Sequence, residues 1–212
     1  MSKIANKLII FTRSPVLGEV KTRLQPTYTP EQSLILHKKL VLNTLMLSQE
    51  VSDCEFDLHC SPNRNSLFFL ECENNFPVSL IDQQGDDLGQ RMAFAFSVAL
   101  QAYNKVVIIG TDCPGINEQY IHQAFAALDN FDAVIGPAAD GGYVLLGLKK
   151  FSPEIFLDIS WGQNKVLTQT KKVLKKLAWS CQELAIMHDI DRPQDLQQYP
   201  EFLNEINKGN TQ

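Results

Sequence analysis

The sequence lacks the features that mark several common classes of protein. Its five cysteines (Cys54, Cys60, Cys72, Cys113 and Cys181) are odd in number and form no Cys-x-x-Cys pair, so they predict neither a disulfide framework nor a zinc site. No apolar stretch approaches the roughly 20 residues of a membrane span. The formal net charge of -5 lacks the basic surplus of nucleic-acid-binding proteins. The opening residues carry no cleavage site of a signal peptide, so we expect a cytoplasmic protein with reduced cysteines.

Two common nucleotide-binding motifs are also missing. No G-x-G-x-x-G occurs, which removes the support for a dinucleotide fold. Lys21 and Thr22 are similar to the end of a P-loop, but that motif needs glycine directly before the lysine, and Val20 stands there. The length of 212 residues and the 44% hydrophobic content are ordinary for a globular domain. Without repeats or linkers, we expect a single domain over residues 1–212, with a frayed tail at 207–212.

Apolar runs alternate with segments of helical periodicity, which predicts right-handed βαβ units. The expected architecture is a three-layer α/β/α fold with a mixed, mostly parallel sheet. Only five residues separate the runs 132–137 and 143–148, so we expect them to form an antiparallel hairpin-like insertion. The predicted strands are 8–11, 55–60, 78–81, 106–109, 132–137, 143–148 and 184–187. The predicted helices are 30–49, 65–73, one ending near 103, 118–128, 164–178 and 192–206.

The most informative stretch runs from Lys105 to Gly115. Val106 to Ile109 are apolar and mostly β-branched, which is typical of a parallel strand buried on both faces. The run ends in a polar loop, and Asp112 follows the strand where open α/β sheets bind their ligands. Mg²⁺ and Mn²⁺ prefer carboxylate oxygens, often with substrate phosphates. Asp112 is therefore a candidate metal ligand; the alternative is a turn former or a cap of the next helix.

The loop after the first predicted strand, 14–24, combines a glycine with basic side chains. Backbone N–H groups and cations both bind anions in such a loop, so it is a candidate phosphate cradle. Arg13, Lys21 and Arg23 fall within eleven residues of an acidic chain. The alternative is that these side chains are solvated surface charge.

Further acidic residues follow later strands. Asp140 precedes two adjacent glycines, which allow close backbone approach to a ligand or a tight turn. Asp189 and Asp191 suit metal ligation, but Asp191 equally suits the N-cap of a helix with Pro193 near its start. Both alternatives stay open for this pair.

Two further residues have a functional and a structural interpretation. Trp161 would stack on a base or a sugar, or close the core. The lone His188 is interpreted as a packed or surface residue rather than a catalytic one.

Taken in order, these loops carry a pattern of motifs. The chain resembles, from Phe11 to Leu196, the bacterial glycosyltransferase-like family of the nucleotide-diphospho-sugar transferase (GT-A) fold, some members of which are associated with arsenosugar biosynthesis. It is more distantly similar to the guanylyltransferases that act on molybdenum cofactor and phospholactate. The segments that carry the resemblance are Pro15-x-x-Gly18-x-x-Lys21-Thr22-Arg23-Leu24, Gln84-x-x-Asp87-Leu88-Gly89-x-Arg91-Met92, Gly110-Thr111-Asp112-Cys113-Pro114, Asp140-Gly141-Gly142-Tyr143-x-Leu145-x-Gly147-Leu148, Trp161 and Asp189-Ile190-Asp191.

The resemblance implies a nucleotide over the N-terminal half of the sheet and an acceptor over the C-terminal half. It implies Mg²⁺ or Mn²⁺ at Asp112 and pocket positions for Asp140 and Asp191. We take Asp140 as the catalytic base or positioning group and Asp191 as a second metal candidate. The chain departs from the family at Gly162 and Gln163, where a hydroxyl residue is expected after the tryptophan. The remaining assignments are Arg13, Gly18, Lys21, Arg23, Asp87 and Arg91 on the nucleotide side, and Gly141, Gly142, Tyr143 and Trp161 on the substrate side.

The preferred hypothesis is a metal-dependent glycosyltransferase that uses a nucleotide-diphospho-sugar. The alternative is a nucleotidyltransferase that transfers a guanylyl or cytidylyl group from a nucleoside triphosphate and releases pyrophosphate. A third hypothesis is a nucleotide-binding module without turnover. The expected partners are the nucleotide donor and a small-molecule acceptor.

Overall fold

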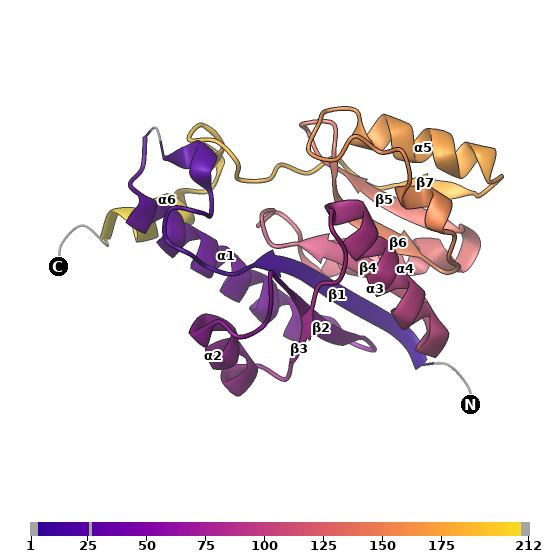
Figure 1. The fold of residues 1–212 in the computed structure, drawn as a ribbon, viewed down its shortest axis with the longest axis horizontal. Helices are drawn as coiled ribbons and strands as arrows, with labels where there is room; N and C mark the ends of the chain where they lie inside the picture. The colour runs from indigo at the N-terminus through magenta and orange to yellow at the C-terminus, as the bar shows by residue number, and fades with distance from the viewer. Residues whose placement is uncertain (1–3, 26, 209–212) are drawn as a thin grey trace.

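The computed structural model describes residues 4–25 and 27–208, which form a seven-stranded sheet between layers of helices (Figure 1). The strand order is β3-β2-β1-β4-β6-β5-β7. Within the described residues, no helix has the length and apolar character to cross a membrane. The strands are β1 (Ile4–Arg13), β2 (Glu55–Ser61), β3 (Ser79–Asp82), β4 (Tyr103–Gly110), β5 (Ala133–Pro137), β6 (Tyr143–Leu148) and β7 (Cys181–Glu183).

The helices connect the strands as the alternation of the sequence predicts. The first begins at a complete capping box, in which the Thr29 hydroxyl accepts from Gln32 N and the Gln32 side chain accepts from Thr29 N. The α-helices are α1 (Pro30–Glu50), α2 (Leu67–Asn75), α3 (Leu88–Ala102), α4 (Glu118–Asn130), α5 (Val166–Lys176) and α6 (Pro200–Lys208), with short 3-10 helices η1 (Thr22–Leu24), η2 (Pro153–Phe156) and η3 (Asp195–Gln198).

The predicted mixed sheet is confirmed. β6 pairs antiparallel with both β4 and β5, while β1, β2, β3 and β4 form a parallel half. Most boundaries differ by a few residues, and two predictions near the C-terminus were wrong. The last strand is Cys181–Glu183 rather than 184–187, where only Met187 forms an isolated bridge to Ala138. The helix predicted over 192–206 is divided, because Pro200 disfavours helical geometry at Tyr199, whose φ is -133°.

The chain end also differs from the prediction. α6 continues to Lys208, two residues into the tail that was expected to fray from 207, and residues 209–212 lie outside the described part of the chain.

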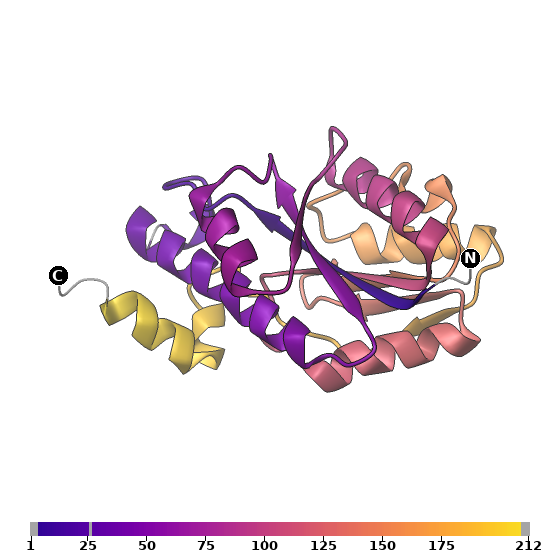
Figure 2. The same ribbon diagram turned by 90° about the horizontal axis from the view of Figure 1, so that it is seen from below.

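Alternating side chains of the central strands bury both faces of the sheet. Leu8 and Ile10 pack with α1, α2 and α4, whereas Ile9 and Phe11 pack with α3, α5 and η2. Figure 2 shows α1 and α4 on one side of the sheet and α3 and α5 on the other. Each fully buried Leu or Ile contributes about 1.5–3 kcal/mol, so this two-sided burial stabilises the three layers. The three-layer α/β/α architecture is confirmed.

One ion pair lies within the parallel half of the sheet. The Lys7 Nζ atom is 2.7 Å from Asp57 Oδ2, and the two side chains are 7% and 19% exposed. Lys7 also lies over the Tyr103 ring, 5.1 Å from its centroid. The buried ammonium of Lys7 has little contact with water, so these partners have to compensate its charge.

We predict that His59 makes stability depend on pH. His59 is 8% exposed on β2, its ring stacks on Phe11 at 5.5 Å, and burial lowers its pKa to about 4. An unfolded histidine titrates near 6.5, so the unfolded state binds more protons between these two values. The free energy of unfolding should therefore fall by up to about 3 kcal/mol as the pH decreases from 6.5 to 4.

The measurement is urea unfolding at several pH values in this range. His59→Phe keeps the ring stacked on Phe11 and should flatten the pH profile. His122→Gln, which changes a surface histidine paired with Glu118, is the matched control. An unaltered slope in His59→Phe would contradict the assignment.

Candidate functional site

A cleft of about 610 Å³ lies at the carboxyl ends of β1 and β4. This is the edge at which open α/β sheets bind their ligands. The loop after β1 and the start of the loop after β4 form its walls. The cleft collects six of the residues that the sequence assigned to a site, namely Arg13, Lys21, Arg23, Arg91, Asp112 and Asp191.

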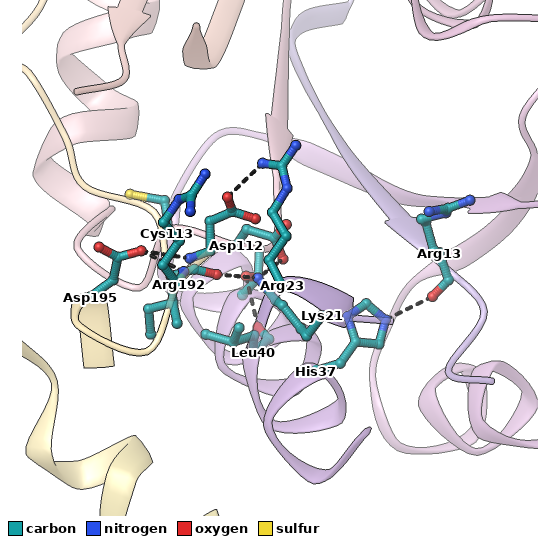
Figure 3. A network of polar contacts seen from close by, with 12 residues as sticks. Arg13, Lys21, Arg23, His37, Leu40, Asp112, Cys113, Arg192 and Asp195 are labelled. Carbon is teal, nitrogen blue, oxygen red and sulfur yellow. Dashed lines mark hydrogen bonds and ion pairs between the residues drawn. The ribbon is translucent and has the colours of Figure 1, made fainter. Parts of the chain in front are cut away.

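The centre of the cleft is an ion pair between Lys21 and Asp112. The Lys21 Nζ atom lies 2.7 Å from Asp112 Oδ1 and donates to the Ile190 carbonyl at 2.5 Å (Figure 3). The lysine side chain is 5% exposed, while the Asp112 side chain is 54% exposed toward the cleft. Lys21 immediately precedes η1, and its φ of 50° lies in the left-handed region. The loop therefore changes direction at this residue.

Lys21 sets the charge state of Asp112. Withdrawal from bulk water acts to raise the pKa of the carboxyl, but the charge and hydrogen bond of Lys21 outweigh it and hold the pKa below its usual value. Asp112 is therefore a carboxylate at neutral pH. The alternative role as a helix cap does not apply, because Asn117 Oδ1 accepts from Tyr120 N and caps α4.

A second ion pair lies at the mouth of the cleft. Arg23 Nη1 is 2.6 Å from Asp191 Oδ2, and both side chains are at least partly exposed. Asp191 is not a helix cap: the turn that follows it is organised by Asp195, whose Oδ2 accepts from the N–H groups of Asp191 and Arg192. The side chain of Asp191 thus positions Arg23, and its role as a metal ligand stays a prediction.

Two further cations come from different elements: Arg13 is anchored through its backbone and Arg91 through its side chain. The Arg13 carbonyl accepts from His37 Nε2 at 2.9 Å, and burial lowers the pKa of His37, so this ring is neutral. Figure 3 shows Arg13 and His37 to one side of Lys21. Arg91 donates through Nη1 to Ser61 Oγ at 2.8 Å and through Nε to the Gly85 carbonyl at 2.9 Å. The cleft therefore presents cationic groups from β1, the 14–24 loop and α3.

Sequence reasoning missed several residues of the cleft wall. Gln83 Nε2 donates to the carbonyls of Thr12 and His59, at 3.1 and 2.8 Å, and so joins the ends of β1 and β2. A signal was available, because Gln83 directly follows β3 just as Asp112 follows the β4 run. His37 gave no such signal, since it lies inside α1.

A group of carboxylates flanks the C-terminal side of Asp112. Asp140 is exposed, and its Oδ1 accepts from Gly142 N at 2.9 Å. Asp189 is half-buried; burial raises the pKa of its carboxyl, and the negative charges of Asp140 and Asp112 act in the same direction. The charges of Asp140 and Asp189 also act on Arg23. These acids are close enough to repel one another, so a cation or a proton would stabilise the group.

The glycine-rich hairpin turn and Trp161 have packing roles. Gly141 has φ 91°, and a side chain there would collide with the backbone of Asn164. The Tyr143 ring meets Trp161 edge to face, with centroids 6.4 Å apart, and Gly89 leaves no room for a Cβ beside the indole. These residues do not line the cleft. Their assignment to substrate binding stays a prediction.

Gly18 and Asp87 also lie outside the wall of the cleft. Gly18 is an exposed turn residue with φ 79° in the 14–24 loop. Asp87 is the N-cap of α3, where its Oδ1 accepts from Gln90 N at 2.8 Å. The structure explains both by backbone geometry, and a role in nucleotide binding is untested.

The described residues contain no group of three or more His, Cys, Asp or Glu side chains that could hold a metal ion. The residues at Asp112 nevertheless fit Mg²⁺ or Mn²⁺. Its carboxylate opens to the cleft, and the Lys21 ammonium beside it marks a position where a cation is favoured. A metal ion held by one carboxylate and by substrate phosphates is a common arrangement for Mg²⁺.

Comparison of the sequence with known proteins gives two matches. A family model described as "Uncharacterized protein conserved in bacteria (DUF2064)" matches residues 44–163. The chain is 30% identical over 139 residues to the 2-phospho-L-lactate guanylyltransferase of Methanocaldococcus infernus. That match covers 66% of this chain and 59% of the archaeal enzyme, so the chain spans about three fifths of the curated relative.

Solved structures share the fold over nearly the whole chain. A Desulfovibrio desulfuricans protein proposed to be a nucleotide-diphospho-sugar transferase has a TM-score of 0.86 and 26% identity, covering 97% of this chain and 95% of that one. A Mycobacterium tuberculosis protein solved as a complex with manganese has a TM-score of 0.53 and 13% identity, covering 96% of this chain and 100% of that one. The second likeness concerns the fold alone.

Proposed function

The chain belongs to the DUF2064 family of bacterial proteins, and on that premise we propose that it is a metal-dependent transferase that uses a nucleotide-diphospho-sugar as its donor. The observation that carries the proposal is the Lys21–Asp112 ion pair in a cleft that also receives Arg13, Arg23 and Arg91. A cleft with this surplus of cations suits a diphosphate, and the fold shared with a protein proposed to be a nucleotide-diphospho-sugar transferase supports that donor.

The donor side uses charges already present in the cleft. Arg13, Arg23 and Arg91 offer forked N–H donors to phosphate oxygens, and Lys21 offers a compact ammonium. As the bond between the sugar and the diphosphate breaks, negative charge grows on the leaving oxygen, where these cations stabilise it. A divalent cation bound at Asp112 would supply further charge neutralisation for the diphosphate.

The acceptor side is acidic, which favours a neutral acceptor hydroxyl over an anionic acceptor. Asp140 and Asp189 would repel a phosphate, whereas a hydroxyl needs a base to receive its proton. In the proposed step the acceptor oxygen bonds to the anomeric carbon, the bond from that carbon to the diphosphate oxygen breaks, and the acceptor proton passes to Asp140. The products are the glycosylated acceptor and a nucleoside diphosphate.

A second candidate is nucleotidyl transfer, which the guanylyltransferase relative favours. The same cations would then hold a triphosphate, the acceptor would bond to the α-phosphorus, and pyrophosphate would leave. The two candidates differ in the leaving group, so the products decide between them.

The test measures products without an identified acceptor. The protein is screened by thermal shift against nucleotide sugars and nucleoside triphosphates with Mn²⁺, and each stabilising ligand is incubated for slow transfer to water. We expect a nucleotide sugar to raise the melting temperature and to release a nucleoside diphosphate. Release of pyrophosphate from a triphosphate would establish the second candidate instead. If no nucleotide binds with or without metal, both candidates fail.

Replacement of the acceptor-side acids should separate chemistry from donor binding. We predict that Asp140→Asn lowers kcat by about 10²–10⁴-fold with little change in the donor KM, because a general base contributes about that factor. Asp189→Asn is the matched variant and should lower kcat less. Transfer to water, measured as release of nucleoside diphosphate, is followed from pH 4 to 8. The pKa of Asp189 is raised, so a base at Asp189 would make kcat fall with decreasing pH already above the usual carboxyl range. If this fall in kcat is absent only in Asp189→Asn, the base is Asp189 rather than Asp140.

A further inference from the structure

Lys21 is already paired with Asp112, so a metal ion that binds Asp112 competes with this ammonium. The Lys21 ammonium is 2.7 Å from Asp112 Oδ1, and its side chain is almost entirely withdrawn from solvent. A metal ion bound to the same carboxylate would lie within a few ångströms of that ammonium. At such a distance two positive charges repel strongly, so Asp112 binds either the ammonium or the metal ion more favourably than both together.

The position of Lys21 is fixed on three sides. Its backbone is in the left-handed region at the start of η1. Its ammonium also donates to the Ile190 carbonyl, and Ile190 N donates to the Asp112 carbonyl at 2.8 Å. The three residues therefore form a closed set of contacts. Without a ligand in the cleft, the ammonium of Lys21 therefore stays paired with Asp112.

A bound phosphate changes this balance. The lysine has a flexible four-carbon stem and three donors, so its ammonium can turn toward a phosphate oxygen in the cleft. Arg23 is held by a different carboxylate, Asp191, at the exposed mouth. It is a second cation in the same cleft without a contact to Asp112, and so it provides a matched control.

We infer that Lys21 occupies the cation position of Asp112 until a nucleotide phosphate draws it away, so that the nucleotide binds before the divalent cation. This inference rests on the proposed function for the identity of the ligands. It adds an order of binding and a positive coupling between nucleotide and metal. Couplings of this kind typically change an affinity by about 5–150-fold.

The experiment measures Mn²⁺ binding to the whole protein without nucleotide, by electron paramagnetic resonance of free Mn²⁺. Lys21→Gln removes the charge and keeps a polar side chain that is one bond shorter. We expect this variant to bind Mn²⁺ about tenfold or more tightly than wild type. Arg23→Gln should change the affinity by less than about threefold. If circular dichroism shows that Lys21→Gln is unfolded, the measurement is made on Lys21→Met, which is also neutral and of similar length.

A second arm measures GDP and UDP binding in the presence of EDTA. The nucleotide that binds wild type should bind Lys21→Gln at least about tenfold more weakly, so the variant gains metal affinity while it loses nucleotide affinity. Equal or weaker Mn²⁺ binding by the Lys21 variants overturns the inference. An equal gain in Arg23→Gln also overturns it, because the effect would then be general electrostatics. Absence of nucleotide binding to wild type, with or without Mn²⁺, is instead a failure of the proposed function.

Discussion

Asp112→Asn is expected to lower donor turnover about a thousandfold while the fold is retained. The substitution keeps the shape of the side chain and removes the only negative charge in direct contact with Lys21 among the ion pairs of the described residues. Metal-assisted charge stabilisation contributes several kcal/mol to such a transition state, and about 4 kcal/mol corresponds to a thousandfold change in rate. The measurement is nucleoside diphosphate release at saturating Mn²⁺.

Asp191→Asn is the matched control for this variant. It removes a carboxylate from the same cleft, but one that pairs with the exposed Arg23. Exposed ion pairs contribute about 0–1 kcal/mol, so if Asp191 only positions Arg23, turnover should remain within about tenfold of wild type. A larger loss would support the predicted role of Asp191 as a second metal ligand. If Asp112→Asn also retained a tenth or more of wild-type turnover, Asp112 would not be a metal ligand in the reaction. Denaturation curves for both variants separate this result from a loss of folding.

The largest expected effect on stability comes from the ion pair within the sheet. Asp57→Asn should lower the free energy of unfolding by about 3 kcal/mol, because it leaves the Lys7 ammonium buried without its carboxylate. Lys7→Met should cost less, since the Asp57 side chain reaches solvent more readily and is solvated there. The free energies are obtained from urea denaturation at pH 7.

The double variant tests the reason for that loss. Lys7→Met/Asp57→Leu removes both charges and should recover most of the stability lost in Asp57→Asn, because a buried ion pair is often replaced by apolar residues at little cost. A double variant as unstable as Asp57→Asn would show that the loss comes from packing rather than from the unpaired charge. Activity should be unchanged, since neither residue lines the cleft.

The layers of the fold followed from sequence because each local pattern agreed with the tertiary structure. The β-branched run Val106 to Ile109 is buried on both faces, and the capping box at Thr29 begins α1 where it was expected. The short spacing between 137 and 143 correctly predicted an antiparallel pair. The last helix failed because the periodicity of its apolar residues continues across Pro200, while the backbone does not.

The site was predicted less completely, for a physical reason. Composition and loop position identified Lys21, Arg23 and Asp112, but the pairing of Lys21 with Asp112 and Arg23 with Asp191 depends on strand order and register. The Lys21 ammonium, for instance, contacts a carbonyl 169 positions away. The structural role of Trp161 beside Gly89 was equally invisible, because the two meet only through tertiary packing. The association with arsenosugar biosynthesis stays a prediction.

The position of β1 inside the sheet, between β2 and β4, also affects how the protein folds. β1 pairs with β2 on one side and β4 on the other, and the pairing of Ile10 with Ile109 closes a loop of about a hundred residues. Contacts of such long separation form slowly and depend on much of the chain being folded. Lys21 and Asp112 meet only once that pairing exists, so ligands of the cleft bind a structure completed late in folding. A ligand should therefore slow unfolding and leave the rate of folding nearly unchanged.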